Sequence, residues 1–243
     1  SFAVFRNAAV ACAGRYVGVS LNADFSLDLA ATLAAIQREQ PKLIWLVYPN
    51  NPTGNSYSDE QIEVIVRAAP GLVIIDEAYE PFAGRSWATR INEFPNVLIM
   101  RTLSKIGLAG VRLGYLFGAP EWINEIDKVR APFNVSVVQQ VAATVILDHY
   151  DELKRHAALM VAERERLFAE LQKLPGVTPF PSKANFVLAR FPDSALVFDA
   201  LKTRGILVRN LSAMHPLMAN TLRISVGIPA EMDALIKALK EIL

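Results

Sequence analysis

The sequence predicts an α/β fold in which helices cover both faces of a mostly parallel sheet, followed by a smaller C-terminal α+β part. Two observations support this class. Short apolar runs alternate with amphipathic helical patterns from residue 15 to residue 117, as they do in βαβ units. After residue 134 the pattern changes to one long helix and then to short strands and helices. With 243 residues and 52% hydrophobic side chains, the chain is long enough to bury a sizeable core.

The first part of the chain contains the alternating elements. Runs of apolar and often β-branched residues predict strands at 16–20, 43–48, 72–76, 97–101 and 114–117. Amphipathic patterns predict helices at 27–39, 58–69 and 121–130, and the second of these opens with Ser58 as N-cap and Gln61 three residues later. In open α/β sheets, ligands bind beyond the carboxyl ends of the strands. The polar clusters after these strands are therefore the candidate sites.

The second part opens with a helical pattern from about residue 136 to residue 173, which Pro175 and Gly176 end. It continues with a strand at 185–190, a helix at 194–204, strands at 206–209 and 222–226, and a helix at 231–242. We therefore expect a large domain at residues 1–134, a connecting helix at 135–175 and a small domain at 176–243.

Charge and composition favour small-molecule chemistry. The chain has 25 basic and 24 acidic residues, so no net field favours binding to nucleic acid or to an anionic membrane. The single Cys12 cannot form an internal disulfide, and the three histidines lack the spacing of a metal site. No apolar run approaches the length needed to span a bilayer. We expect a cytoplasmic protein without a bound metal.

Three polar motifs follow consecutive predicted strands. They are Pro-Asn-Asn-Pro-Thr-Gly at 49–54, Asp-Glu-Ala-Tyr at 76–79, and Arg-Thr-Leu-Ser-Lys at 101–105 with an arginine at 112. Taken singly, the first motif could be a plain turn, Asp76 a helix cap and Lys105 a solvated surface charge. An amine, hydroxyls and a guanidinium at the spacing of the third motif suit a phosphorylated aldehyde held as a Schiff base. The order of all three motifs favours a cofactor site.

This series of motifs resembles the fold-type I pyridoxal-phosphate aminotransferases of classes I and II. Three further segments, at 182–186, 207–211 and 222–227, look most like those of the histidinol-phosphate aminotransferase subfamily. The resemblance covers essentially the whole chain, and it is more specific for the cofactor than for the substrate. It implies pyridoxal 5'-phosphate as cofactor and the fold-type I architecture, with the first part of the chain as the cofactor-binding domain.

The resemblance also implies a role for each residue around the cofactor. Lys105 would form the Schiff base and move the proton between the substrate carbon and the cofactor. Asp76 would pair with the pyridine nitrogen, and Asn51 and Tyr79 would bind the phenolic oxygen. The remaining cofactor contacts would be the ring stacking of Phe2 and the phosphate ligands Thr102, Ser104 and Arg112.

For the substrate, the resemblance implies that Arg223 binds the α-carboxylate and that Arg209 is a second substrate arginine. Guanidinium groups suit both a carboxylate and a phosphate ester. The implied reaction is transamination between histidinol phosphate and 2-oxoglutarate in histidine biosynthesis, catalysed by a homodimer acting on an amino donor and a 2-oxo acid. The alternatives are an aromatic amino-acid aminotransferase, a phosphothreonine decarboxylase-like enzyme, and a non-enzymatic effector domain of a regulator.

The N-terminus of the chain differs from the family pattern. Members of the family begin well before the position of Ser1, and their additional segment contributes strands of the large sheet and cofactor contacts. We therefore expect the large domain to be incomplete at its N-terminus. If this sequence is the whole protein, we expect weak or absent cofactor binding and an inactive fragment. If it is a portion of a longer protein, we expect that protein to be an active dimeric aminotransferase.

Overall fold

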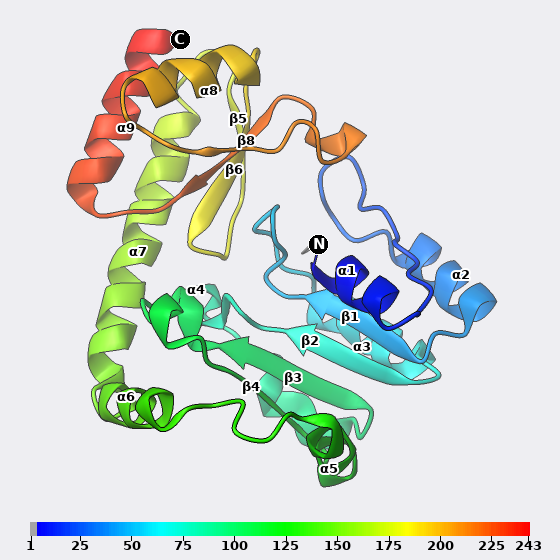
Figure 1. Ribbon diagram of the computed structural model, residues 1–243. Coiled ribbons are helices and arrows are strands. Elements are labelled where there is room, and N and C mark those ends of the chain that lie inside the picture. Colours follow the sequence, from blue (N-terminus) through cyan, green and yellow to red (C-terminus); the bar gives the residue numbers. More distant parts are fainter. Residues whose placement is uncertain (1–3) are drawn as a thin grey trace.

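Two four-stranded sheets, joined by a long helix, form the framework of the protein in the computed structural model, which describes residues 4–243 (Figure 1). The first sheet, sheet A, has the order β1-β2-β3-β4, in which β1, β2 and β3 are parallel and β4 is antiparallel to β3. Its strands are β1 (Leu43–Val47), β2 (Leu72–Asp76), β3 (Val97–Thr102) and β4 (Gly114–Gly118).

Helices cover both faces of sheet A, because its strands present apolar side chains on each side. On one face, Val73 and Ile75 of β2 are buried in a cluster with residues of α2 (Leu29–Glu39) and α3 (Asp59–Ala68). On the other face, Trp45 of β1 stacks on Phe5 of α1 (Val4–Ala11), with ring centroids 4.3 Å apart. The predicted α/β fold class is confirmed.

Local signals define the remaining elements around sheet A. The predicted capping box begins α3: the Ser58 hydroxyl accepts the Gln61 N–H, and the Gln61 side chain accepts the Ser58 N–H. Between β2 and β4 the connections are short. They consist of α4 (Glu80–Ala83) and the 3-10 helices η1 (Trp87–Glu93), η2 (Leu103–Lys105) and η3 (Ala109–Val111), and α5 (Pro120–Val129) follows β4.

The second sheet, sheet B, is antiparallel, with the order β5-β6-β8-β7. Its core lies between the strands and three helices, α7 (Tyr150–Leu171), α8 and α9, and Leu171 and Leu239 in it are fully buried. Strand β5 was not predicted, because it contains Pro179, which a sheet tolerates only at an edge. The elements of this part are β5 (Thr178–Phe180), β6 (Phe186–Arg190), α8 (Ser194–Thr203), β7 (Arg209–Asn210), η4 (Pro216–Met218), β8 (Thr221–Ser225) and α9 (Pro229–Ile242).

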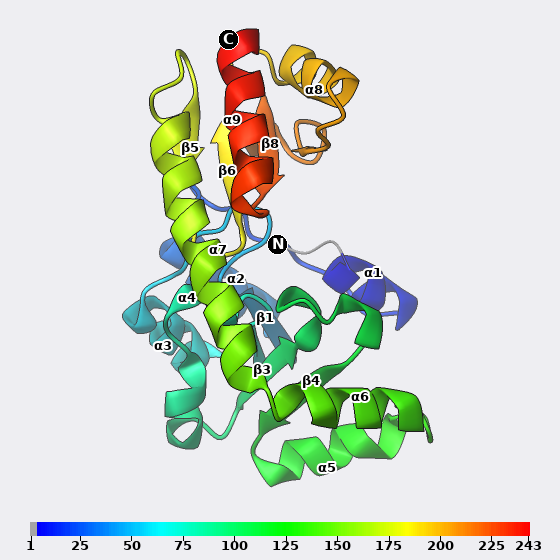
Figure 2. The ribbon, with the colours of Figure 1, turned by 90° about the vertical axis from the view of Figure 1, so that its left-hand side faces the viewer.

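Helix α7 (Tyr150–Leu171) extends from the side of sheet A to the side of sheet B (Figure 2). Midway along it, Arg164 is only 3% exposed, and its Nη1 donates to the carbonyl oxygens of Phe82, 3.1 Å away, and Ala184, 3.2 Å away. A buried guanidinium needs such acceptors, and these two lie in α4 and in the segment before β6. Arg164 therefore ties the two parts of the molecule to one helix.

The prediction of one helix over residues 136–173 is wrong at one point. The structure has two helices, α6 (Val137–Leu147) and α7, separated at Asp148 and His149. The His149 N–H donates to the Ile146 carbonyl in a tight 3-10 turn, and His149 has a φ of -108° and a ψ of 30°. Asp and His both have low helix propensity, so the long pattern breaks where they adjoin.

Two predicted strands also differ from the structure. Residues 16–20 form no strand, and Tyr16, Val17 and Val19 are exposed, because no described strand pairs with them and a lone strand leaves its backbone groups unsatisfied. The strand predicted at 206–209 is reduced to β7, which pairs with β8 only at Arg209 and Asn210. Hydrophobic patterning cannot show whether a partner strand exists.

Candidate active site

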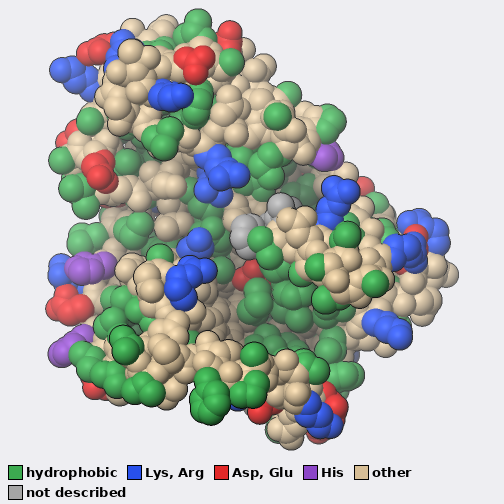
Figure 3. All heavy atoms as spheres, viewed as in Figure 1, with side chains coloured by type: hydrophobic (Ala, Val, Ile, Leu, Met, Phe, Trp, Pro, Cys, Tyr) green, Lys and Arg blue, Asp and Glu red, His purple; other side chains and the backbone are tan. Residues whose placement is uncertain are grey.

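The candidate site lies at the carboxyl ends of the three parallel strands, at the edge of sheet A that faces sheet B. Asn51 follows β1, Asp76 ends β2, and Lys105 follows β3 after one turn. Parallel strands bring their carboxyl ends to one edge of a sheet. In the space-filling view, basic side chains gather around the hollow between the two parts of the molecule (Figure 3). The motifs at 49–54 and 101–105 therefore lie on either side of the motif at 76–79, at the same edge of the sheet.

Asp76 is a buried acid with little to stabilise its charge. It is 5% exposed, and its carboxylate accepts one hydrogen bond among the described residues, from the Ala78 N–H at 3.0 Å. Burial raises the pKa of the Asp76 carboxyl to about 6, against the opposing effects of the Ala78 hydrogen bond and of the Lys105 charge. A cation placed against this carboxylate would stabilise its ionised form.

Lys105 ends the 3-10 helix η2 and is half-buried. Its Nζ lies 5.4 Å from the centroid of the Tyr79 ring. Burial lowers the pKa of the Lys105 amine, and the charges of Arg223 and Arg112 lower it further, while Asp76 opposes them. A depressed pKa increases the fraction of neutral amine, which is the nucleophilic form.

Tyr79 and Phe186 form an aromatic pair that connects the two sheets. Tyr79 is 5% exposed, and its ring meets the Phe186 ring edge-on, with centroids 5.3 Å apart. Burial raises the pKa of the Tyr79 phenol, so that it remains a hydrogen-bond donor at neutral pH. Sequence reasoning assigned no role to Phe186, although it lies in the motif at 182–186, because only the fold brings β6 to Tyr79.

Arg223 reaches the site from β8 of sheet B. Its Nη1 donates to Oδ1 of Asn51 at 2.8 Å, and its guanidinium lies 4.9 Å from the centroid of the Phe186 ring. The Nε of Arg223 is buried and has no hydrogen-bond partner within residues 4–243. Burial lowers the pKa of Arg223, and the charge of Arg209 adds to this effect. A bound anion would satisfy the free Nε and offset both penalties.

Arg209 is the register partner of Arg223 across β7 and β8, so two arginines lie side by side at this end of sheet B. Unlike Arg223, it is exposed. Two adjacent cations repel each other unless an anion lies between or beside them. This pairing is consistent with an anion site at the edge of sheet B that faces Lys105.

The residues predicted to bind a phosphate lie in the turn between β3 and β4. The Thr102 hydroxyl accepts the Ser104 N–H at 3.1 Å and lies 3.0 Å from the Ser104 hydroxyl. Arg112 has a φ of +54°, and its guanidinium donates to the Ala109 carbonyl at 3.3 Å. The structure therefore brings the two hydroxyls together, and the exposed Arg112 lies close enough to Lys105 for its charge to lower the pKa of that amine. Phe2 lies outside the described residues.

A glycine joins the first motif to sheet B. The Gly54 carbonyl accepts the Lys183 N–H at 2.7 Å, and Gly54 has a φ of +80°. A Cβ at this position would lie 2.4 Å from the Ser182 Oγ. Only glycine allows both the backbone angle and this close approach. The contact holds Asn51 beside Arg223.

Replacing Gly54 by alanine is expected to lower the free energy of unfolding by about 2–4 kcal/mol, from a left-handed backbone angle and an overpacked contact together. Urea denaturation measures the loss. Gly84→Ala is the matched control, because Gly84 has a φ of +70° and nothing lies within 4 Å of its added Cβ. Equal losses in the two variants would show that the approach of Ser182 adds no constraint.

Replacing Asp76 by asparagine is expected to remove a pH dependence from the stability of the cofactor-free protein. The native pKa of about 6 lies above the ordinary value of 3.8, so between these values the folded state binds more protons than the unfolded state. Wild-type stability therefore falls, relative to the variant, as pH rises from about 4 to about 6, by about 3 kcal/mol in all. Urea unfolding at several pH values measures the difference, and a constant difference would contradict the burial argument.

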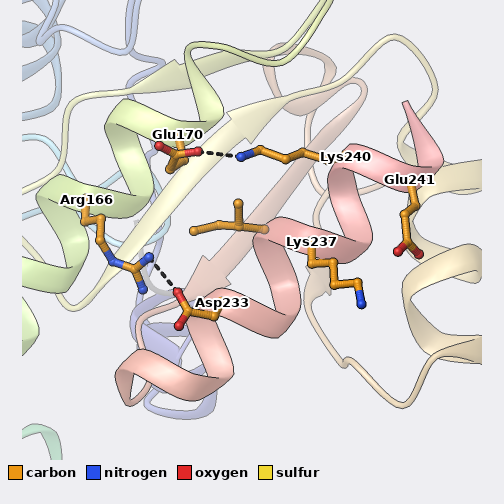
Figure 4. Close-up of a pocket in the computed structure, with 7 residues that line it drawn as sticks. Arg166, Glu170, Asp233, Lys237, Lys240 and Glu241 are labelled. Atoms are coloured by element: carbon orange, nitrogen blue, oxygen red, sulfur yellow. Dashed lines mark hydrogen bonds and ion pairs between the residues drawn. The ribbon is translucent and has the colours of Figure 1, made fainter.

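A surface cavity of about 460 Å³ lies elsewhere, between α7 and α9 (Figure 4). Its charges largely neutralise one another: Arg166 pairs with Asp233 at 2.7 Å, and Glu170 pairs with Lys240 at 2.9 Å. In the described part of the chain, no group of three or more His, Cys, Asp or Glu residues could hold a metal ion, and no helix is long and apolar enough to cross a membrane. The edge of sheet A remains the best candidate site.

Comparison with protein families gives a match over nearly the whole chain. The family model for aminotransferase class I and II matches residues 1–239. Among curated proteins, the histidinol-phosphate aminotransferase of Methylibium petroleiphilum is 56% identical over 94% of this chain and 62% of its own length. Histidinol-phosphate aminotransferase 1 of Burkholderia lata is 55% identical over 93% of this chain and 63% of its own length. The chain thus spans less than two thirds of these relatives.

Solved structures give the same result for the fold. The histidinol-phosphate aminotransferase of Sinorhizobium meliloti, solved in complex with pyridoxal-5'-phosphate, has a TM-score of 0.87 and 31% identity over 99% of this chain and 67% of its own. The histidinol-phosphate aminotransferase of Clostridium acetobutylicum has a TM-score of 0.92 over 100% of this chain and 75% of its own. Its identity is 23%, so it supports the fold alone.

Proposed function

The chain belongs to the class I and II aminotransferases, and from that premise we propose that the full-length protein is a pyridoxal-phosphate-dependent histidinol-phosphate aminotransferase. The proposal is carried by one observation: a buried acid, a lysine with a depressed pKa and a half-buried arginine, whose Nε has no partner among the described residues, meet at one sheet edge. The names of the relatives at 55% and 56% identity support the choice of substrate.

The residues present are suited to hold pyridoxal phosphate. The Lys105 charge offsets only part of the effect of burial on the Asp76 carboxylate, and a protonated ring nitrogen would place a further cation against it. When bound, pyridoxal phosphate supplies an aldehyde that condenses with amines and a ring that stabilises negative charge on the substrate carbon. The paired hydroxyls of Thr102 and Ser104, with the exposed Arg112, form a donor set for a phosphate.

The proposal assigns a role to each site residue. The Lys105 amine holds the aldehyde carbon and, once the substrate amine replaces it, moves a proton at the substrate carbon. Asp76 keeps the ring nitrogen protonated, while Asn51 and Tyr79 donate hydrogen bonds to the phenolic oxygen. The phosphate is bound by Thr102, Ser104 and Arg112, and ring stacking is the role that the family resemblance implies for Phe2, which lies outside the described residues.

Arg223 and Arg209 bind the substrate anions in this proposal. The two amino donors differ in the anionic group that the arginines bind, because histidinol phosphate has a phosphate ester and glutamate has carboxylates. A guanidinium forms paired hydrogen bonds with either anion. One arginine pair therefore serves both half-reactions, with 2-oxoglutarate as the acceptor 2-oxo acid.

The proposal extends to the organisation of the protein. Residues 1–134 act as the cofactor-binding domain, 135–175 as the connection and 176–243 as the small domain, a division supported by separate cores on sheet A and sheet B. A homodimer would cover the apolar surface of α6, where Val138 is 78% exposed. The cytoplasm is the proposed location, since charged phosphate esters do not cross membranes unaided.

Steady-state kinetics of the full-length protein test the proposal. We expect the highest kcat/KM with histidinol phosphate and 2-oxoglutarate, and lower values with phenylalanine, tyrosine and aspartate as donors. Carbon dioxide release from phosphothreonine measures decarboxylation in parallel. A preference for an aromatic amino acid, or decarboxylation faster than transamination, would contradict the proposed substrate.

A further inference from the structure

Glu77 follows Asp76 directly in the chain, but its side chain lies on the opposite face of sheet A, since successive strand residues point to opposite faces. The Glu77 side chain is fully buried. Its Oε1 accepts the Trp87 N–H at 2.6 Å, and its Oε2 accepts two hydrogen bonds from Arg101, at 3.0 Å from Nε and 2.8 Å from Nη2. The Glu77 side chain points away from the candidate site, but its charge adds to burial in raising the pKa of Asp76.

Arg101 precedes a site residue on β3 but likewise points to the opposite face of sheet A. It precedes Thr102 in β3, and its guanidinium lies 5.6 Å from the centroid of the Phe117 ring, on the face away from Asp76. The Ser86 hydroxyl accepts a hydrogen bond from Arg101 at 2.7 Å and donates one to Glu77 at 2.8 Å. We call Glu77, Ser86 and Arg101 the clamp. Within the clamp both oxygens of the buried carboxylate accept hydrogen bonds, and Arg101 makes a further ion pair with Glu80 at 3.4 Å.

The clamp lies directly behind the site. Glu77 also bonds to β3 through its backbone, because its N–H donates to the Met100 carbonyl at 2.8 Å. The clamp thus fixes the backbone beside Asp76 and the backbone that leads through Thr102 to Lys105. Adjacent Cα atoms are a fixed ~3.8 Å apart, so a shift of either clamped residue moves its neighbour in the site.

We propose that the clamp sets the distance between Asp76 and Lys105, so that Glu77 and Arg101 are positioning residues of the active site. This inference rests on the proposed function, because Asp76 and Lys105 act on the same cofactor ring. The substrate arginines lie on β7 and β8 of sheet B, outside the clamp. Loosening the clamp would therefore misplace the cofactor groups and leave the substrate-binding residues in place.

The test uses Glu77→Gln in the full-length holoprotein, a substitution that keeps the shape of the side chain and removes its charge. We expect kcat to fall about tenfold to a hundredfold, as misplacement of reacting groups by about 1 Å does, with little change in the KM for histidinol phosphate. We also expect weaker binding of pyridoxal phosphate and a shifted midpoint in the pH titration of its visible absorbance. Arg101→Lys, which keeps the charge but loses the paired hydrogen bonds, should give a smaller change in the same direction.

Leu171→Ala is the matched control, because Leu171 is fully buried in the core of sheet B and its truncation destabilises the fold far from the clamp. We expect it to leave cofactor affinity and the absorbance midpoint unchanged. If Glu77→Gln lowers thermal stability but leaves both readouts at their wild-type values, the clamp only stabilises the sheet and the inference is wrong. If Glu77→Gln does not fold, Arg101→Lys decides by the same readouts. Wild-type protein that binds no pyridoxal phosphate would instead overturn the proposed function, and this inference with it.

Discussion

Replacing Lys105 by alanine in the full-length protein is expected to reduce transamination by about 10⁴-fold or more, because one amine both holds the aldehyde and transfers the proton. The structure supports this role through the depressed pKa of the Lys105 amine and its position over Tyr79, within the field of Asp76. Steady-state rates measure the loss. Borohydride reduction of the holoprotein, followed by peptide mass spectrometry, shows whether pyridoxal phosphate is attached to residue 105.

Lys183→Ala is the matched control for this substitution. Lys183 is exposed, and the contact that it makes with the first motif uses its backbone N–H, which alanine retains. We expect wild-type rates and an unchanged site of cofactor attachment in this variant. Substantial turnover in Lys105→Ala, or labelling of a different lysine in the wild-type protein, would refute the assignment.

Replacing Arg223 by glutamine is expected to lower kcat/KM about 10²- to 10³-fold, or about 3–4 kcal/mol, for both amino donors. The loss has two sources. The substrate anion loses a half-buried guanidinium, and Asn51 loses the hydrogen-bond donor that lies 2.8 Å from its Oδ1. Separate measurements of the half-reactions with histidinol phosphate and with glutamate give the two values. Arg209→Gln should have a smaller effect, because Arg209 is exposed.

Arg190→Gln provides the control for the arginine series. Arg190 also belongs to sheet B, but its guanidinium donates to the Leu217 carbonyl at 2.8 Å. It is expected to leave both half-reactions unchanged. If Arg223→Gln impairs only one half-reaction, a single anion site does not serve both substrates.

The parallel core of the fold was predictable from the sequence because its signals are local. The apolar runs that became β1, β2 and β3 each contain adjacent buried residues, which lie on opposite faces of the sheet, so each run appears in the sequence as a continuous hydrophobic segment. The Ser58 capping box began α3 as predicted. The elements that differ are those that depend on a neighbour: residues 16–20 have the composition of a strand, but no described strand pairs with them.

Some residues of the candidate site were also identifiable from the sequence, and others only from the structure. The motifs identified Lys105, Asp76 and Asn51, because their residue types and their order along consecutive strands are visible in one dimension. Three-dimensional proximity placed Phe186 against Tyr79 and showed that Glu77 and Arg101 pair behind the site. Glu77 and Arg101 are 24 residues apart, and no helical or strand periodicity links residues at that separation, so the sequence pattern could not predict their contact.

Local hydrophobic periodicity and short motifs were enough to identify the family, the polar residues at the strand ends and the candidate cofactor ligands. The burial of each charge became visible only in the folded chain, and with it the raised pKa of Asp76, the lowered pKa of Lys105 and the Arg223 Nε that lacks a partner among the described residues. Desolvation depends on every group packed around a charge, and here those groups come from both sheets.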